Sequence, residues 1–252
     1  DAGGIIAEQG PDGVRMEWHD GQWHSRHHLR VVEAAARHRI AVNPHEPIKD
    51  TGLRRTYPNW VAREGARGAE YDAWGAPGNN VDHVPTLVYT RMLAGPMDYT
   101  PGVLSLEGRG GRPIDSTLAR QLAYYIAIYS PIQMAADTIE NLARYPRELA
   151  FIAQVPADWS DSRLIEGAVG DYALFRRKDR NSEDWYVGGV TDATARDVTV
   201  PLAFLDAGRR YRATIYRDGD DADYRQATRH SIVIEEREVT AADSIALRMA
   251  PG

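Results

Sequence analysis

The sequence predicts an α/β region over residues 1–157 followed by an all-β domain over residues 158–252. Two patterns support this fold class. An early strand–helix–strand pattern has polar residues at its exit, and a series of short strand-like segments begins after Trp159. We therefore expect strands and helices to alternate in the first region, and a small antiparallel β-sandwich to form in the second.

The strand–helix–strand pattern spans residues 14–42. Val14–Trp18 predicts a short strand, and Gln22–His38 has apolar residues at the spacing of one helix face. Asp20 stands where an N-cap residue is expected. The apolar run Ile40–Val42 predicts a second strand with polar residues at its exit, which is typical of a βαβ unit.

Further along the α/β region, residues 81–93 predict a helix that follows a loop rich in glycine and proline. The clearest helix of the chain covers residues 118–129, where Asp115 or Ser116 is the expected cap and Ser130-Pro131 is the expected end. Residues 131–137 predict one more strand, which ends at the carboxylate of Asp137.

The all-β domain is predicted from short apolar or alternating runs separated by turn-rich segments, a spacing typical of small antiparallel sandwiches. These runs are Tyr172–Phe175, Trp185–Val187, Val198–Val200, Tyr211–Tyr216, Ser231–Ile234 and Ile245–Leu247.

Composition excludes several classes of function. The net charge of -6 argues against a nucleic-acid partner, because phosphate binding needs a basic surface. The sequence has no apolar run of about 18 residues, so we expect no membrane span. The chain has no cysteine and hence no disulfide or thiolate metal site. Because it begins with aspartate rather than methionine, we expect a processed product or a piece of a longer protein, and no signal peptide can be judged.

Most of the chemically useful side chains lie within residues 42–71. This stretch contains Glu46, Glu64, Glu70, His45, Lys49 and several arginines. Prolines and glycines interrupt it, so it cannot form a buried core, and functional groups tend to lie on loops of this kind. The stretch therefore predicts a loop-borne chemical site.

Surface ion pairing is the alternative explanation for this charge, and we expect the arginines to be pairing partners and loop supports. The segment from His45 to Lys49 lacks the second histidine of a zinc motif, and Pro47 would break the required helix. A second acidic group predicts a solvated turn rather than a calcium loop, since it lacks the glycine and terminal glutamate of that motif. Its members are Asp218, Asp220, Asp221 and Asp223.

Three ordered segments resemble glycoside hydrolase family 97, whose members include α-glucosidases and α-galactosidases. The first runs from VNPHEP through TGLRRTYPNWVAREGARGAEY, the second is TRMLAGPMDYTPG, and the third is LARQLAYYIAIYSPIQMAAD. The likeness continues through DWYVGG and the β-rich tail, so it covers nearly the whole chain.

The resemblance implies a particular architecture. Family members have an N-terminal β-sandwich, a catalytic (β/α)8 barrel and a C-terminal β domain. Residues 1–157 would then form an incomplete (β/α)8 TIM-type barrel with the later strands only, and residues 158–252 a C-terminal β-sandwich domain. We expect the chain to form a homo-oligomer or to pair with a missing N-terminal half. The family also implies a periplasmic or secreted location.

The resemblance also implies the chemistry, since glycoside hydrolysis needs two carboxyl groups beside the bond that is cleaved. Glu70 matches the general acid and Glu46 the base of the inverting branch, which cleaves α-glucosidic bonds of oligosaccharides. The expected substrate contacts are His45, Glu17, His19, Lys49 and Asp98. The resemblance implies one calcium ion as well, for which Glu46, Glu64 and Glu70 are the expected ligands.

Two alternatives remain open at this stage. The first is a retaining α-galactosidase-type hydrolase in which Glu17 acts as the nucleophile. The second is a truncated, inactive family member that needs a missing N-terminal half.

Overall fold

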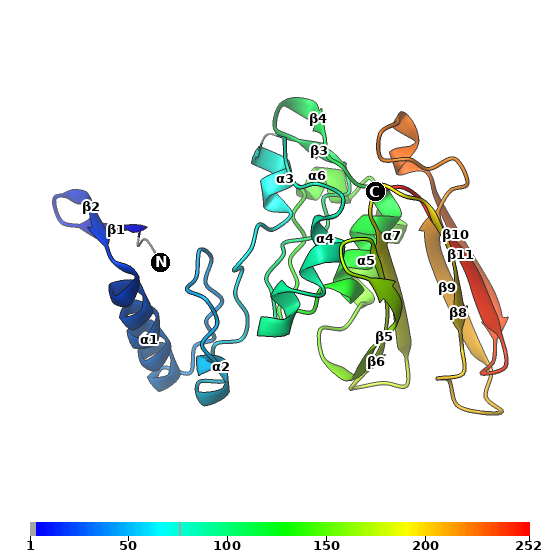
Figure 1. Cartoon of the computed structure of the whole chain (residues 1–252), viewed down its shortest axis with the longest axis horizontal. Coiled ribbons are helices and arrows are strands. Elements are labelled where there is room, and N and C mark those ends of the chain that lie inside the picture. The colour runs from blue at the N-terminus through cyan, green and yellow to red at the C-terminus, as the bar shows by residue number, and fades with distance from the viewer. Residues whose placement is uncertain (1–3, 76) are drawn as a thin grey trace. The chain divides into compact units, whose positions relative to one another are not determined.

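The computed structural model describes residues 4–75 and 77–252, which fall into two compact units, Asp1–Ala66 and Arg67–Gly252. Figure 1 shows the course of the chain from the N-terminal hairpin to the C-terminal strands. Each unit has its own secondary structure and is described by itself.

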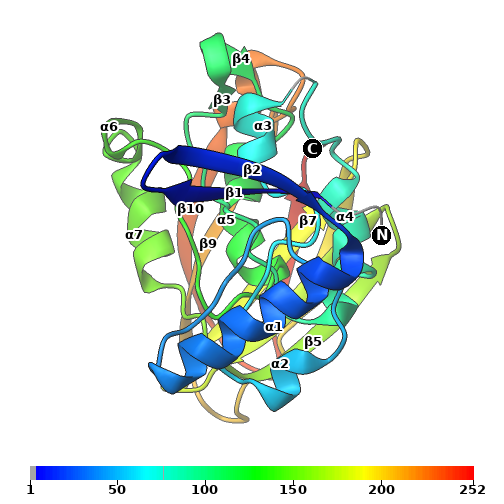
Figure 2. The same ribbon diagram turned by 90° about the vertical axis from the view of Figure 1, so that its left-hand side faces the viewer.

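The first unit begins with two strands, β1 (Gly4–Gly10) and β2 (Gly13–His19), which form an antiparallel hairpin leading into helix α1 (Gly21–Arg37; Figure 2). The predicted strand and helix are confirmed, and so is the cap, because the Asp20 side chain accepts a hydrogen bond of 2.7 Å from Trp23 N–H. The strand β1 was not predicted, since the first residues show little periodicity.

The predicted strand at Ile40–Val42 is wrong. Val42 makes a single parallel bridge with Trp60, while β2, its expected neighbour, pairs with β1 instead. The Asn59 side chain donates to the carbonyl oxygens of Val32 and Ile40, at 3.0 and 3.3 Å, and ties this loop to α1. The loop also contains the short helix α2 (Leu53–Thr56).

The first part of the second unit is mainly helical. Its helices are α3 (Glu70–Trp74), α4 (His83–Leu87), the 3-10 helix η1 (Arg91–Ala94), α5 (Leu118–Ala127), α6 (Ile139–Leu142) and α7 (Pro146–Gln154). The helix predicted over residues 81–93 is thus two short pieces. Thr90 leaves the helical region of the backbone, with φ −122° and ψ −77°, and β-branched residues are frequent in this stretch and disfavour a helix.

Helix α5 confirms the clearest predicted helix, but its cap differs from the prediction. The Thr117 side chain, rather than Asp115 or Ser116, accepts a hydrogen bond of 3.3 Å from Arg120 N–H. Thr117 has the extended backbone that an N-cap requires, with φ −97° and ψ 162°.

The strand predicted over residues 131–137 is also wrong. The Met134 carbonyl accepts from the Tyr125 hydroxyl at 2.7 Å, and Ala136 N–H donates to the Pro101 carbonyl at 2.9 Å. The backbone of this segment therefore bonds to α5 and to a loop instead of joining a sheet.

The C-terminal part of the second unit is rich in strands. A three-stranded antiparallel sheet contains β5 (Trp159–Ala168), β6 (Tyr172–Asp179) and β7 (Trp185–Thr191). The remaining strands pair as β8 (Arg196–Pro201) with β11 (Ser244–Met249), and as β9 (Tyr211–Asp218) with β10 (Ile232–Val239). All six predicted runs are strands, and β5 was not predicted.

Three short elements complete the second unit. A hairpin of β3 (Glu107–Gly108) and β4 (Arg112–Pro113) has the 3-10 turn η2 (Arg109–Gly111) at its tip. A further 3-10 helix, η3 (Ala227–His230), lies between β9 and β10.

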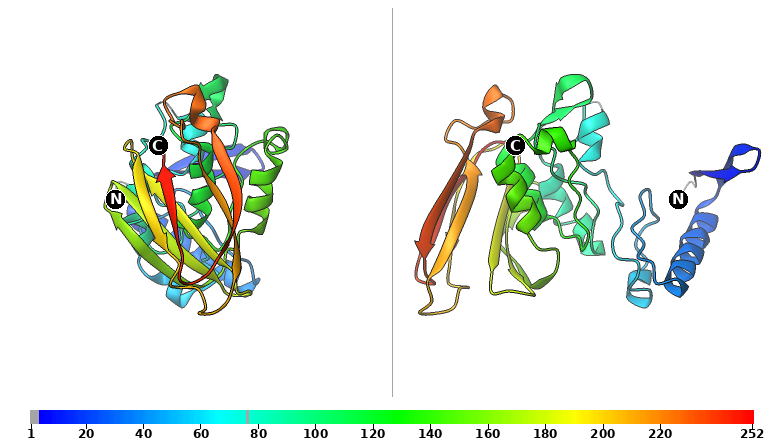
Figure 3. Two further views of the ribbon diagram at one scale, coloured as in Figure 1. Left: turned by 90° about the vertical axis from the view of Figure 1, so that its right-hand side faces the viewer. Right: turned by 180° about the vertical axis from the view of Figure 1, so that it is seen from behind.

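The strands are layered, and the three-stranded sheet lies between helix α5 and the pair formed by β8 and β11 (Figure 3). Strand β9 also contacts the helices directly, since the Tyr216 ring lies 5.1 Å from that of Phe151 on α7. One buried cluster joins the strand layers, and its members include Leu174, Val200, Ile215, Ile245 and Met249. The fold is therefore a mixture of helices and antiparallel sheets with a strand-rich C-terminal part, as the sequence predicts at that level. The incomplete barrel and the domain boundary at residue 157 remain predictions.

Helix α5 lies close against β7 and β6. A Cβ atom on Gly188 would approach the Ile126 Cβ to 2.6 Å, so the strand can pack this closely only because it has a glycine there. At the end of the helix, Arg177 Nε donates to the Ile126 carbonyl at 2.6 Å. Burial lowers the pKa of Arg177 to about 10.

The buried cluster between the strand layers predicts the effect of a truncation. Leu174 is 1% exposed, so Leu174→Ala should lower the free energy of unfolding by about 2–5 kcal/mol. Leu164 lies in the same sheet but is 43% exposed, so Leu164→Ala should change it by less than about 0.5 kcal/mol. Urea denaturation followed by circular dichroism measures both, and equal losses would contradict the described packing.

Candidate active site

Backbone pairing brings three of the predicted site residues together in the first unit. Val61 N–H donates to the Val42 carbonyl at 3.0 Å, and Glu64 N–H donates to the Pro44 carbonyl at 3.1 Å. The two sides of the loop therefore meet just beyond the Val42–Trp60 bridge, so that residues 44–46 lie beside Glu64.

The resulting group consists of His45, Glu46 and Glu64. Glu64 Oε2 accepts a hydrogen bond of 3.1 Å from Glu46 N–H and lies 3.9 Å from His45 Nδ1. The Glu64 side chain is 14% exposed, whereas that of His45 is 34% exposed. Glu46 has a φ of 42°, a left-handed conformation that is uncommon for residues other than glycine. Such local strain persists where the surrounding structure holds it, and it often marks functional sites.

A buried ion-pair network supports this loop. Asp50 Oδ2 accepts from Arg54 Nε at 3.1 Å, and Asp50 Oδ1 lies 3.5 Å from Arg63 Nη2. The Arg63 guanidinium stands 4.1 Å from the centre of the Trp60 ring and donates to the Ile48 carbonyl. Arg54 and Arg63 therefore act as the predicted pairing partners and loop supports.

The charged surroundings change the acidity of Asp50. Burial alone would raise its pKa, but the hydrogen bond from Gly52 N–H and the charges of Arg54 and Arg63 outweigh burial. The pKa of Asp50 is therefore below its ordinary value, and the carboxylate is ionised at neutral pH.

The remaining predicted contacts in the first unit have local partners. Glu17 lies on β2 within 4.0 Å of Arg15 and 3.8 Å of His19. The His19 ring stacks on Trp23 with centroids 3.7 Å apart. Lys49 is exposed on the loop.

Glu70, the predicted general acid, is the first residue of α3 in the second unit and is half-buried. Asp98, a predicted substrate contact, is 1% exposed. Trp74 at the end of α3 is 63% exposed, and its ring meets that of Tyr71 edge to face.

Two further polar residues at this end of the unit were not predicted from the sequence, namely buried Asp72 on α3 and half-buried His83 on α4. Burial raises the pKa of Asp72 to about 6, although its carboxylate Oδ1 accepts a hydrogen bond of 2.6 Å from Asn79 N–H. Burial likewise lowers the pKa of His83, whose Nε2 lies 2.8 Å from the Arg67 carbonyl. The only feature of the sequence that could have drawn attention to Asp72 is its position two residues after Glu70, and that position does not show that its side chain is buried.

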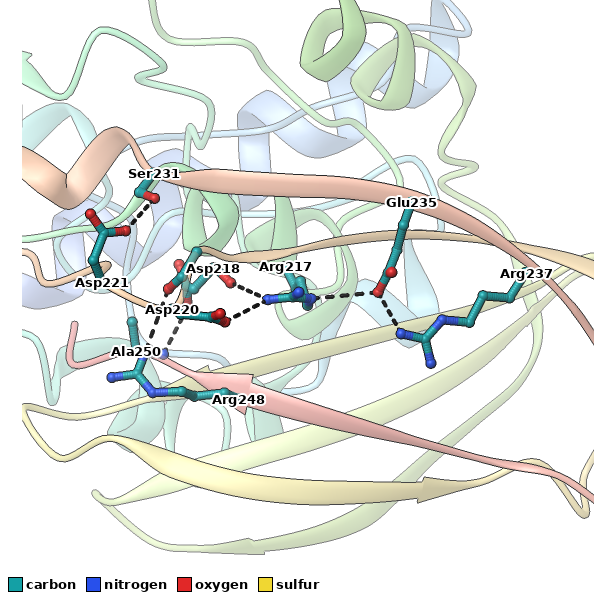
Figure 4. Close-up of polar contacts among 10 residues, drawn as sticks. Arg217, Asp218, Asp220, Asp221, Ser231, Glu235, Arg237, Arg248 and Ala250 are labelled. Carbon is teal, nitrogen blue, oxygen red and sulfur yellow. Dashed lines mark hydrogen bonds and ion pairs between the residues drawn. The ribbon is translucent and has the colours of Figure 1, made fainter.

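The acidic residues at the end of β9 and in the turn that follows it each have a hydrogen-bond or ion-pair partner (Figure 4). Arg217 contacts Asp220 at 3.2 Å, and the Ser231 hydroxyl donates to Asp221 at 2.6 Å. Asp223 pairs with Arg225, and Asp218 accepts from Ala250 N–H at 2.9 Å. A turn was predicted, but Asp218 is buried rather than solvated, and burial raises its pKa.

Comparison with known sequences identifies the family. A profile described as "Glycoside hydrolase 97" matches residues 4–66, and one described as "Glycosyl-hydrolase 97 C-terminal, oligomerisation" matches residues 158–252. The chain belongs to glycoside hydrolase family 97, as its motifs predicted.

Two curated relatives are similar in sequence to most of this chain. A "Retaining alpha-galactosidase" of Bacteroides thetaiotaomicron is 35% identical over 86% of this chain and 34% of its own length. A "Probable retaining alpha-galactosidase" of Streptomyces bingchenggensis is 30% identical over 94% of this chain and 34% of its own length. The chain thus spans about a third of the length of the curated relatives it matches.

A solved structure is also similar. It is a glycoside hydrolase family 97 enzyme from Pseudoalteromonas sp. strain K8 in complex with panose, with 48% identity and a TM-score of 0.87. The match covers 98% of this chain and 39% of that enzyme. Among the helices of residues 4–75 and 77–252, none is long and apolar enough to cross a membrane.

The buried Asp50 network gives a pH-dependent prediction. Because Asp50→Asn breaks the ion pair that Asp50 makes with the buried side chain of Arg63, it should cost about 3–5 kcal/mol of unfolding free energy at pH 7. The pKa of Asp50 is lowered by folding, so its stabilising effect is present above its unfolded pKa and lost as pH falls through its folded pKa. The difference between the two proteins should therefore shrink below about pH 4.

Urea denaturation at several pH values measures this difference. Glu17→Gln is the matched control, because it removes the same charge from an exposed pair and should cost about 0–1 kcal/mol. A deficit for Asp50→Asn that stayed constant down to pH 3 would show that the charge of Asp50 is not its source.

Proposed function

We propose that this protein acts as a glycoside hydrolase that cleaves α-glucosidic bonds of oligosaccharides with inversion, assisted by calcium. The observation that supports this most directly is the likeness to the panose-bound family 97 enzyme along 98% of the chain. Panose is a trisaccharide of α-linked glucose, and its binding to that enzyme supports α-glucosidic oligosaccharides as the substrate class proposed for this chain. Glu46, which matches the base of the inverting branch, favours the same conclusion.

The two carboxyl groups would have separate tasks. Glu70 would hold a proton and deliver it to the leaving oxygen, while ionised Glu46 would take a proton from the attacking water. An inverting site needs room for that water between its carboxyl groups. His45 and Lys49 would hydrogen-bond sugar hydroxyls, and Glu17, His19 and Asp98 would complete the substrate contacts.

The residues fit a calcium ion in their donor chemistry. Calcium prefers oxygen ligands, and Glu46, Glu64 and Glu70 can each offer a carboxylate. In the described loop, Glu64 already directs one oxygen toward the backbone N–H of Glu46 and the ring of His45. A bound calcium ion would supply positive charge that polarises a neighbouring oxygen.

A retaining α-galactosidase is the second candidate, because both curated relatives have that name. In that mechanism Glu17 would attack the anomeric carbon and form a covalent intermediate, which water then hydrolyses. The exposed position of Glu17 on β2 leaves its carboxylate accessible to a substrate.

Association completes the proposal. The description of the profile that matches residues 158–252 includes the word oligomerisation, and this supports self-association through this part of the chain. Since the chain spans about a third of its curated relatives, pairing with an N-terminal half is the alternative, and that half would be needed for activity. We also propose a periplasmic or secreted location.

Glu70→Gln gives the most direct test of catalysis. The change keeps the shape of the side chain and removes its proton, so hydrolysis of panose, whose leaving sugar oxygen needs that proton, should slow by about 100- to 10,000-fold with calcium present. Glu140→Gln, an exposed change on α6, should leave the rate unchanged.

Two measurements separate the candidates. NMR of the first product formed identifies its anomer. Retention of configuration at the anomeric carbon would contradict the inverting mechanism. Faster turnover of p-nitrophenyl α-galactoside than of p-nitrophenyl α-glucoside would favour the second candidate, provided that Glu17→Gln abolishes it. If the unchanged chain turns over neither substrate, it does not act alone.

Calcium binding can be measured without activity. Isothermal titration of the chain with calcium should give one strong site, and Glu64→Gln should weaken it by about tenfold or more because a charged oxygen ligand is lost. Glu166→Gln on β5, which is exposed, serves as the control. Equal affinity in the Glu64 variant and the unchanged chain would remove Glu64 from the ligand set.

A further inference from the structure

Helix α3, which begins with Glu70, is too short to be stable by itself. It has five residues, and Ala69 at its N-cap position supplies no side-chain hydrogen bond. Isolated helices of this length do not persist in water, because their nucleation cost is not recovered. Contacts from outside the helix must therefore fix its position.

Arg112 supplies those contacts at the C-terminal end of α3. Its Nη2 donates to the Asp72 carbonyl at 2.6 Å and to the Gly75 carbonyl, and its Nη1 donates to the Pro77 carbonyl at 2.6 Å. The last carbonyl groups of a helix have no partners within it. A positive charge there is also favoured by the helix dipole.

The hairpin that carries Arg112 is anchored in the core. It lies on β4, in a hairpin that begins after Leu106 and ends before Ile114, each 1% exposed and joined by a hydrogen bond of 3.0 Å. Opposite Arg112, a Cβ atom on Gly108 would approach the Asp72 carbonyl to 2.8 Å. The hairpin can reach the helix only because this position is a glycine.

The other end of α3 is held as well. Ala69 N–H donates to the Tyr99 carbonyl at 2.7 Å. Asn79 connects the two ends, since its backbone N–H bonds to Asp72 and its side-chain Nδ2 donates to the Gly68 carbonyl at 2.9 Å. Arg112 therefore completes a set of contacts that leaves the helix little freedom to rotate or shift.

We propose that Arg112 is a positioning residue that orients Glu70 for proton transfer by clamping the C-terminal end of α3. This inference rests on the proposed role of Glu70 as the general acid. Arg112 acts through the backbone of the helix, and its effect is on geometry, because proton transfer requires the acid within hydrogen-bond reach of the leaving oxygen.

Arg112→Gln tests the clamp in the full chain, with Arg109→Gln as the matched control. Arg109 is an exposed arginine at the tip of the same hairpin. Hydrogen exchange measured by mass spectrometry should show faster exchange of the amides of residues 71–75 in the Arg112 variant and no change in the control. This readout does not depend on activity.

Hydrolysis of panose, whose leaving sugar oxygen must be protonated, separates positioning from a general loss of structure. We expect kcat of Arg112→Gln to fall about 10- to 100-fold while KM stays within about twofold, because the acid is misplaced but sugar contacts persist. In Arg112→Ala, millimolar guanidinium should restore part of kcat, since it can occupy the emptied position and bind the same carbonyls.

The outcomes are distinguishable. Unchanged exchange at residues 71–75 in Arg112→Gln would overturn the clamp, whatever the activity. Faster exchange with an unchanged kcat would overturn the positioning of Glu70. If the unchanged chain has no turnover, it does not act alone, and the exchange experiment by itself decides whether Arg112 holds α3.

Discussion

The packing of α5 is the constraint on which the second unit depends. Nine of its ten residues are buried, so the polar ones among them must find partners. Gln121 accepts from the N–H groups of Gly102 and Val103, and Arg120 donates to the Thr191 carbonyl. The Tyr125 hydroxyl donates to Met134. The helix thereby fixes a loop on each side as well as one face of the sheet.

Arginine side chains have a recurring role in this chain, because long irregular segments leave many carbonyl groups without partners in regular secondary structure. Arg177 closes the end of α5, Arg112 closes the end of α3, and Arg63 binds a carbonyl in the loop that holds Glu46. The planar guanidinium suits this task, since it offers five donors at fixed angles. In these three arginines, the charge supports the backbone from within the fold rather than forming surface ion pairs alone.

The candidate site was predictable only in part. The motif around His45 and Glu46 identified the family and its chemical groups, and the comparisons confirm the family. The resemblance implied that Glu46 and Glu64 lie together around one calcium ion, but the backbone pairing between residues 42–44 and 60–64 that brings them together was not predicted. Asp72 and Arg112 were missed for a similar reason, since their partners lie 7 and 40 positions away in the chain.

Helix α1 with its Asp20 cap, helix α5 and six of the C-terminal strands could be predicted because each has a local pattern of apolar spacing, capping or turns. The family could be predicted from its ordered motifs. The tertiary structure decided the rest. Residues 40–42 and 131–137 have the composition of strands, yet a strand exists only when a neighbour offers its free edge. Their backbone groups bond to loops and side chains instead. Burial decided the acidity of Asp72 in the same way, because the cost of desolvating a carboxylate depends on surroundings that the sequence does not show.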